Sequence, residues 1–282
     1  MELPSRERGP LRRLPPTLSV ALALLVAALA AFALSAAERA RAASTEAPAS
    51  EESARVSAVV DGETLELADG RGLRLMGIIV PMPPLDAEPG RRWPLAERAS
   101  AALRELALGR TVRLVFEGPR SDRYGRLLAQ VYRDDGLWLE GELIARGLAR
   151  VLTHKDARAL AAEMLARERE AREHRRGLWA TRAFRVLAPE EARRHLDSFE
   201  LVEGKIESVR KSGTREFLRM GGDQGSGCTA ILLPEGRRLF AQAGMRGEAL
   251  SGRRVRVRGF LRWWNGPVIE VDHPEQIEVL GP

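Results

Sequence analysis

Short apolar runs that alternate with polar residues recur along the chain from residue 55 onward. In the first half, these runs occupy residues 56–60, 64–68, 73–79, 111–116 and 127–132. Pairs of turn-forming residues such as Asp61-Gly62 and Asp135-Gly136 separate them. Apolar residues at every second position indicate half-buried strands, and glycine beside aspartate marks turns. The pattern therefore predicts five strands that form a small, partly open barrel.

Helical periodicity interrupts and follows these strands. Apolar residues recur every three or four positions over residues 95–108, 139–148 and 156–176, which is the spacing of one face of an α-helix. The last segment also carries charged residues three and four positions apart, and such pairs support a helix face in water. Gly177-Leu178-Trp179 is expected to end this helix.

The second half predicts another set of strands, after a helical linker at residues 181–198. Its apolar runs lie at 201–209, 216–220, 228–233, 253–263, 267–271 and 276–279. Trp264-Asn265-Gly266 separates two of them, and Asn-Gly is a strong signal for a two-residue hairpin. We therefore expect a mainly β protein with α (α+β). Its two small barrels, at residues 55–180 and 199–282, are expected to be of the oligonucleotide/oligosaccharide-binding (OB) type.

The first 42 residues read as a targeting segment. Four arginines precede an apolar run of 20 residues at 18–37, which is close to the length that spans a bilayer. Ala40-Arg41-Ala42 offers a site for a signal peptidase. We predict a signal peptide or transmembrane anchor at 1–42 and a flexible tether at 43–54. The folded part is then exported to the periplasmic side of a bacterial envelope, with the membrane as a partner of the N-terminal helix.

Composition adds little to this interpretation. Residues 1–42 hold six arginines and three acids, so half of the formal charge of +6 belongs to the targeting segment. The remainder is a weak footprint for a protein that binds a polyanion. Cys228 is the single cysteine, which excludes an internal disulfide, and the four histidines show no metal-ligand spacing.

Three motifs follow one another in the first half, and they carry the candidate chemistry. They are Asp61-Gly62-Glu63-Thr64, then Arg74-Leu75-Met76-Gly77-Ile78-Ile79-Val80-Pro81-Met82, then Ser121-Asp122-Arg123-Tyr124-Gly125-Arg126. In this order and spacing the chain resembles the staphylococcal nuclease (thermonuclease) family over residues 55 to 180. The resemblance implies an OB-type barrel that cuts phosphodiesters with one calcium ion, a glutamate base and two arginines.

Several catalytic positions of that family are altered in this chain. By the resemblance, Arg74 and Arg126 occupy the positions of the two phosphate-clamping arginines. Glu63 stands in place of the aspartate that is the first metal ligand. Ile79 occupies the position of the second metal carboxylate, and Met82 occupies that of the general base.

The chemistry of these side chains predicts little or no calcium-dependent hydrolysis. Calcium takes roughly six to eight oxygen ligands, and Ile79 offers a hydrocarbon. A general base must accept a proton, and the Met82 thioether has no useful basicity. No cofactor is therefore expected, and calcium would bind only to a rearranged site that uses an acid such as Asp86 or Glu88.

Three functions remain open from the sequence. The first is an exported protein related to nucleases that is inactive and acts as a binding or scaffold module. The second is an active nuclease that hydrolyses DNA or RNA with a rearranged metal site. The third is a binder of nucleic acid or another phosphate-bearing ligand, through Arg74, Arg126 and the arginines at 254–258, with Tyr124 stacking on a base. Alternatively, both arginines pair with local acids and serve structure only.

The second barrel offers one further candidate surface. Arg254, Arg256 and Arg258 alternate with apolar residues, and together with Trp263 and Trp264 they suggest a nucleic-acid platform. The alternative is a solvated sheet face. In that case the arginines pair with acids, for which the sequence offers Glu270, Asp272 and Glu278.

Overall fold

The computed structural model describes residues 50–83, 88, 92–221 and 227–281. The predicted targeting segment at 1–42, and the tether as far as residue 49, lie outside these residues. In the part of the chain that is described, no helix is both long and apolar enough to cross a membrane.

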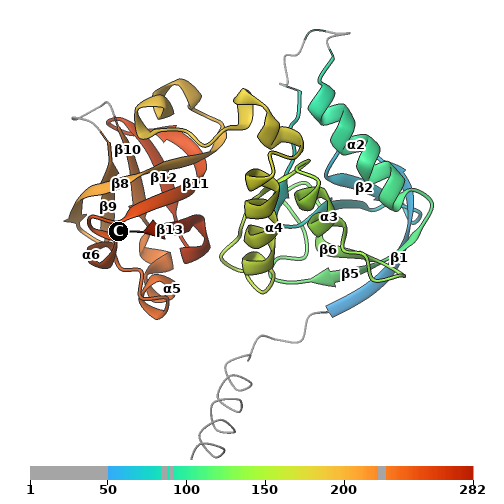
Figure 1. The fold of residues 1–282 in the computed structure, drawn as a ribbon. Coiled ribbons are helices and arrows are strands. Elements are labelled where there is room, and N and C mark those ends of the chain that lie inside the picture. Colours follow the sequence, from blue (N-terminus) through green and yellow to red (C-terminus); the bar gives the residue numbers. More distant parts are fainter. Residues whose placement is uncertain (1–49, 84–87, 89–91, 222–226, 282) are drawn as a thin grey trace, which may run out of the picture. The chain divides into compact units, whose positions relative to one another are not determined.

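The first half folds around a five-stranded barrel (Figure 1). The strands are β1 (Ser50–Val59), β2 (Thr64–Leu67), β3 (Gly72–Leu75), β5 (Thr111–Phe116) and β6 (Leu127–Arg133). They pair in the order β1-β2-β3-β6-β5, and β3 and β6 run parallel. The barrel is closed rather than partly open, because β1 pairs with β2 at one edge and with β5 at the other. The mixed α+β class and the first barrel are thus confirmed.

Strand β1 begins earlier than the sequence predicts. Residues 50–54 were placed in the flexible tether, yet Ser50 pairs with Phe116 of β5. The acids that made this segment look like a linker form cross-strand ion pairs. Glu51 lies 2.8 Å from Arg113, and Glu52 contacts Arg71. Backbone pairing along β5 therefore outweighs a composition that favours disorder.

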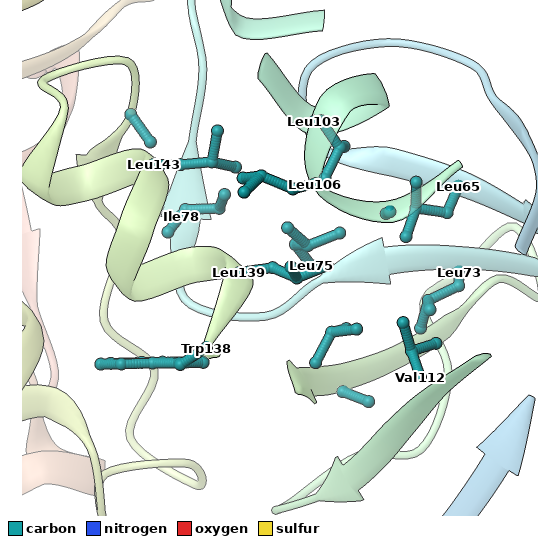
Figure 2. Close-up of a cluster of buried hydrophobic side chains, with 14 of the residues drawn as sticks. Leu65, Leu73, Leu75, Ile78, Leu103, Leu106, Val112, Trp138, Leu139 and Leu143 are labelled. Atoms are coloured by element: carbon teal, nitrogen blue, oxygen red, sulfur yellow. The ribbon is translucent and has the colours of Figure 1, made fainter. Parts of the chain in front are cut away.

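Three helices cover the barrel, namely α2 (Pro94–Ala107), α3 (Leu139–Ala145) and α4 (Ala161–Glu173). Helix α2 turns Leu103 and Leu106 toward Leu65 and Leu75 of the strands, and Leu139 of α3 joins the same core (Figure 2). All five leucines are at most 2% exposed. Each such side chain contributes about 1.5–3 kcal/mol through burial, so this core is what holds the helices on the barrel.

Shorter elements complete the first half. Strands β4 (Ile78–Ile79) and β7 (Arg150–Val151) form a separate two-stranded sheet. A 3-10 helix, η1 (Gly177–Ala180), follows α4 and buries Trp179. The linker contains two more 3-10 helices, η2 (Arg182–Phe184) and η3 (Pro189–His195).

The second half repeats the strand order of the first barrel. It contains β8 (Phe199–Ser212), β9 (Arg215–Met220), β10 (Cys228–Leu232), β11 (Arg254–Trp263), β12 (Pro267–Val271) and β13 (Ile277–Gly281), with short helices η4 (Pro234–Gly236), α5 (Arg237–Gln242), α6 (Gly247–Leu250) and η5 (Pro274–Gln276). The pairings β8-β9-β10-β12-β11 return to β8 and form a ring, and β13 extends it from β11. Strands β10 and β12 run parallel, as β3 and β6 do in the first barrel.

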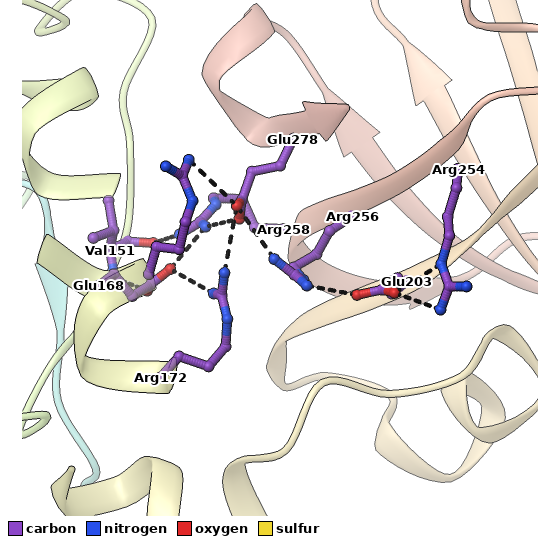
Figure 3. Close-up of polar contacts among 9 residues, drawn as sticks. Val151, Glu168, Arg172, Glu203, Arg254, Arg256, Arg258 and Glu278 are labelled. Atoms are coloured by element: carbon purple, nitrogen blue, oxygen red, sulfur yellow. Dashed lines mark hydrogen bonds and ion pairs between the residues drawn. The ribbon is translucent and has the colours of Figure 1, made fainter. Parts of the chain in front are cut away.

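Buried ion pairs connect the two halves, and they include the arginines of β11 (Figure 3). Arg258 is 1% exposed and lies 2.8 Å from Glu168 of α4 and 2.7 Å from Glu278 of β13. It also donates to the Val151 carbonyl of β7 at 3.0 Å. Burial lowers the pKa of the Arg258 guanidinium, but the two carboxylates outweigh burial and hold this pKa above its ordinary value. The arginine therefore stays charged inside the protein.

Arg254 and Arg256 of the same strand also have carboxylate partners. Arg256 lies 2.6 Å from Glu203 and 3.2 Å from Glu278, and Arg254 lies 2.7 Å from Glu203. The interpretation of these arginines as a nucleic-acid platform is therefore wrong. Among the acids named from the sequence, only Glu278 takes part in these pairs.

Candidate functional site

The fold brings the three motifs together on one side of the first barrel. Arg74 of β3 pairs in register with Thr64 of β2. The Arg126 guanidinium reaches the same hydroxyl, with Nη1 3.5 Å from Thr64 Oγ1. The stem of Arg126 passes so close to Gly72 that a Cβ there would lie 3.1 Å from its Cγ. Motifs separated by up to 62 residues along the chain thus meet at Thr64, through strand pairing with Arg74 and through the side chain of Arg126.

Glu63 is buried and both of its carboxylate oxygens are engaged. Oε1 lies 2.8 Å from Arg74 Nη2, and Oε2 accepts the Val80 backbone N–H at 3.0 Å. Asp61 fixes the turn by accepting the Glu63 backbone N–H at 2.8 Å. Burial raises the pKa of Glu63 above its ordinary value, although the Arg74 charge and the Val80 bond oppose the rise. A cation at this carboxylate would have to share it with the Arg74 guanidinium, whose positive charge repels the cation.

Ile79 contributes to hydrophobic packing instead of ligation. Its backbone pairs with Arg150 in the β4–β7 sheet. Its side chain packs against a cluster that contains Leu178 and Trp179 together with Phe199 and Leu201 of the second half. The position that holds the second metal carboxylate in the family therefore belongs here to an apolar contact between the two halves.

Met82 and the acids after it add no ligand set. Met82 is 48% exposed, and its thioether accepts protons poorly. Glu88 is exposed, and Asp86 lies outside the described residues. Within those residues, no group of three or more His, Cys, Asp or Glu side chains is placed to hold a metal ion. Of the two family positions for a metal carboxylate, only Glu63 supplies one here, so the described residues at these positions do not fit calcium.

Arg126 is held by an acid from its own turn. Its Nε and Nη2 both lie 2.7 Å from Asp122 Oδ2. Asp122 Oδ1 accepts the backbone N–H groups of Tyr124 and Arg126 at 2.8 and 3.0 Å. Burial raises the pKa of Asp122, but these bonds outweigh burial and hold it below its ordinary value. Gly125 completes the turn with a φ of +77°, where a side chain would be strained.

Tyr124 is 68% exposed beside this turn. Its hydroxyl accepts a bond of 2.7 Å from Arg123, and the Arg126 guanidinium lies 5.5 Å from its ring centroid. Arg74 and Arg126 keep 27% and 30% of their side chains exposed. The site can therefore offer a partly exposed guanidinium edge and an aromatic ring to a ligand. At position 82, where the family has its general base, the described chain has a methionine, which cannot deprotonate a water molecule.

Sequence reasoning missed a buried polar network next to the site. Glu140 of α3 is fully buried, and its two oxygens accept the Val131 backbone N–H at 3.2 and 3.1 Å. Gln130 donates to the Met76 carbonyl at 3.1 Å and accepts the Trp138 indole N–H at 2.9 Å. The amphipathic pattern gave no signal for Glu140, because a glutamate at the start of a helix normally faces water.

Comparisons with known proteins agree with this geometry. The family model described as staphylococcal nuclease homologue matches residues 72–181. A protein named "uncharacterized endonuclease" from Escherichia coli is 31% identical over 127 residues, which cover 45% of this chain and 76% of that protein. An uncharacterized protein from Bacillus anthracis is 29% identical over 136 residues, which cover 46% of this chain and 62% of that protein. The chain belongs to the staphylococcal nuclease family.

Proposed function

We propose that this protein is a member of the nuclease family that has lost calcium-dependent hydrolysis and serves as a binding or scaffold module. The observation that carries the proposal is the state of Glu63. It is the carboxylate that remains at a metal position, and it is 4% exposed with both oxygens bonded to Arg74 and Val80.

The surrounding positions support the same conclusion. A carboxylate at position 79 would have to lie against the apolar cluster of Leu178 and Trp179, where an unpaired charge is costly. The loss of a general base typically lowers a rate by about 10²–10⁴, and Met82 replaces that base. Without a metal carboxylate at position 79 and a base at position 82, the described motif residues can bind a ligand but lack the groups for hydrolysis.

Nucleic acid is the ligand class that family membership implies for the first barrel. Arg74, Arg126 and Tyr124 are the residues we assign to contact a phosphate and a base there. Both guanidiniums already have a carboxylate partner. A phosphate must therefore compete with Glu63 and Asp122, which favours weak contact over a tight clamp.

An active nuclease with a rearranged metal site is the second candidate. Two relatives from Escherichia coli carry the name endonuclease, and this is the observation that favours it. The rearrangement would need acids from residues 84–91, and would need Glu63 to exchange Arg74 for a metal ion.

A cleavage assay separates the two candidates. Full-length protein in detergent is incubated with labelled single-stranded DNA, in calcium and in a chelator. We expect no cleavage products, either in calcium or in the chelator. Calcium-dependent products that disappear in Arg126→Ala and persist in Arg104→Ala would overturn the proposal. Arg104 is the matched control because it is an exposed arginine of α2 outside the three motifs.

We also propose that the folded part is exported, anchored or released by the segment at 1–42. The support is the sequence alone, namely four arginines followed by the apolar run at 18–37. Protease added to intact cells or spheroplasts should degrade the folded part if it lies outside the cytoplasmic membrane. Protection until the membrane is lysed would contradict export.

A further inference from the structure

A groove of about 820 Å³ lies on the second half of the protein, away from the nuclease motifs. Strands β8, β9 and β10 form its floor, and the hairpin between β11 and β12 forms one wall. Sites of this volume are typical of small-ligand pockets. The groove is therefore large enough for a short stretch of an extended ligand.

Strand register places basic and aromatic side chains side by side on this floor. Arg210 of β8 pairs with Phe217 of β9, and Arg219 of β9 pairs with Thr229 of β10. All four residues line the groove. Leu218, which lies between Phe217 and Arg219, is fully buried in the core. The period of two along β9 thus sends apolar residues inward and these groups outward.

Two tryptophans of the hairpin project into water. Trp263 and Trp264 are 53% and 46% exposed, whereas Trp138 and Trp179 of the first half are each only 7% exposed. The ring of Trp264 lies 5.7 Å from that of Phe217. A backbone bond of 2.8 Å from Trp264 N to the Gly266 carbonyl fixes the hairpin that presents them. Exposed aromatic rings held on a rigid turn are suited to stack against a flat ligand.

The charge of the groove distinguishes it from the rest of the second half. No acidic residue is among the described residues that line it. Arg215 lies 5.6 Å from the Trp264 ring and Arg193 lies 5.3 Å from the Trp263 ring. Across the described chain, neither of them nor Arg210 has a carboxylate within ion-pair distance, in contrast to Arg254 and Arg256. The unneutralised cations select an anionic ligand.

We propose that this groove binds single-stranded nucleic acid. Bases stack on Trp264, Trp263 and Phe217, while Arg210 and Arg215 contact phosphates. The aromatic faces require unpaired bases, because the bases of a duplex already stack on one another. Acidic peptides would satisfy the arginines but leave the stacking rings unused, and sulfated polysaccharides are distinguished by the competition with dextran sulfate below. The proposal concerns a different surface from the Glu63 site, and it holds whether or not the first barrel hydrolyses its ligand.

Fluorescence anisotropy with full-length protein in detergent tests this site. The probe is a labelled oligothymidylate of about a dozen nucleotides, within the range of roughly 4–16 that one OB-type barrel covers. The buffer contains a chelator, so that cleavage plays no part. We expect Trp264→Ala to weaken binding about tenfold or more, with recovery in Trp264→Phe. Arg210→Ala should weaken binding and flatten the slope of log K against log salt by about 0.7.

The controls make each outcome decisive. Arg104→Ala removes an exposed arginine outside the groove and should bind the probe as the parent does. Thermal melts verify that Trp264→Ala and Arg210→Ala remain folded. Equal binding by the parent and Trp264→Ala would overturn the proposal, as would equal affinity for duplex DNA or full displacement by dextran sulfate at matched charge. Cleavage in a separate assay with calcium would contradict the proposed loss of hydrolysis, but it would not bear on binding in the groove.

Discussion

Burial from water determines the pKa and the partners of two carboxylates near the nuclease motifs. Glu63 and Glu140 are both buried, and burial raises the pKa of each. Glu63 is partly compensated by the Arg74 charge, whereas Glu140 relies on a backbone N–H of Val131. Both carboxylates are at most 4% exposed, so neither is open to the several water and protein oxygens that a hard cation gathers around itself. At the residue scale, the carboxylate at the proposed metal position forms a buried ion pair with Arg74.

The pKa of Glu140 makes the stability of the fold depend on pH. Burial raises this pKa from 4.5 to about 8. The folded state holds the Glu140 proton more tightly than the unfolded state does. The contribution of this proton to the free energy of unfolding is therefore complete below pH 4.5 and is lost as the pH rises through about 8. Urea unfolding of Glu140→Gln should therefore show a flatter pH dependence between these values. Glu142→Gln, two residues further along α3, is the control and should keep the pH dependence of the parent. Equal pH dependence in all three proteins would contradict the role of Glu140.

At the scale of elements, the strands could be predicted well from the sequence. Their signals are local: alternation along β11, the Asn265-Gly266 turn, and the glycine-containing turns of the first barrel. The start of β1 at Ser50 could not be predicted, because the pairing partner that orders it is β5, about 60 residues later. The three nuclease motifs were also visible, because each is a contiguous stretch. Partners such as Arg258 and Glu168 are 90 residues apart, and only the fold brings them together.

In the small sheet of β4 and β7, Ile79 takes part in hydrophobic packing. Ile79 is partly buried and packs against the apolar cluster that contains Leu178 and Phe199. An aspartate there would place a charge on an apolar cluster, beside an Arg150 that already pairs with Glu200, so Ile79→Asp should lower the free energy of unfolding by about 2–4 kcal/mol. Chemical denaturation measures the loss. Met82→Asp is the control, since this side chain is half-exposed, and it should change stability by less than about 0.5 kcal/mol. Equal effects of the two substitutions would rule out the packing role.

At the scale of the whole molecule, two rings with one strand order are joined by a charged core. Arg258 of β11 is enclosed by Glu168 of α4 and Glu278 of β13, and it also reaches Val151 of β7. The second half therefore supplies the counter-charge for a glutamate buried in the first. Arg254, Arg256 and Arg258 are thus paired with carboxylates, whereas Arg210 and Arg215 have no carboxylate partner among the described residues and remain available to a ligand.

This arrangement predicts that the two halves unfold together. Arg258→Ala leaves Glu168 and Glu278 with reduced compensation, and breaking a buried pair in this way typically costs about 3–5 kcal/mol. We expect the single unfolding transition of the parent, followed by circular dichroism and tryptophan fluorescence, to move to lower denaturant and to separate into two steps. Arg254→Ala removes an exposed partner of Glu203 and should cost less than about 1 kcal/mol. If both variants unfold like the parent, the buried arginine does not couple the halves.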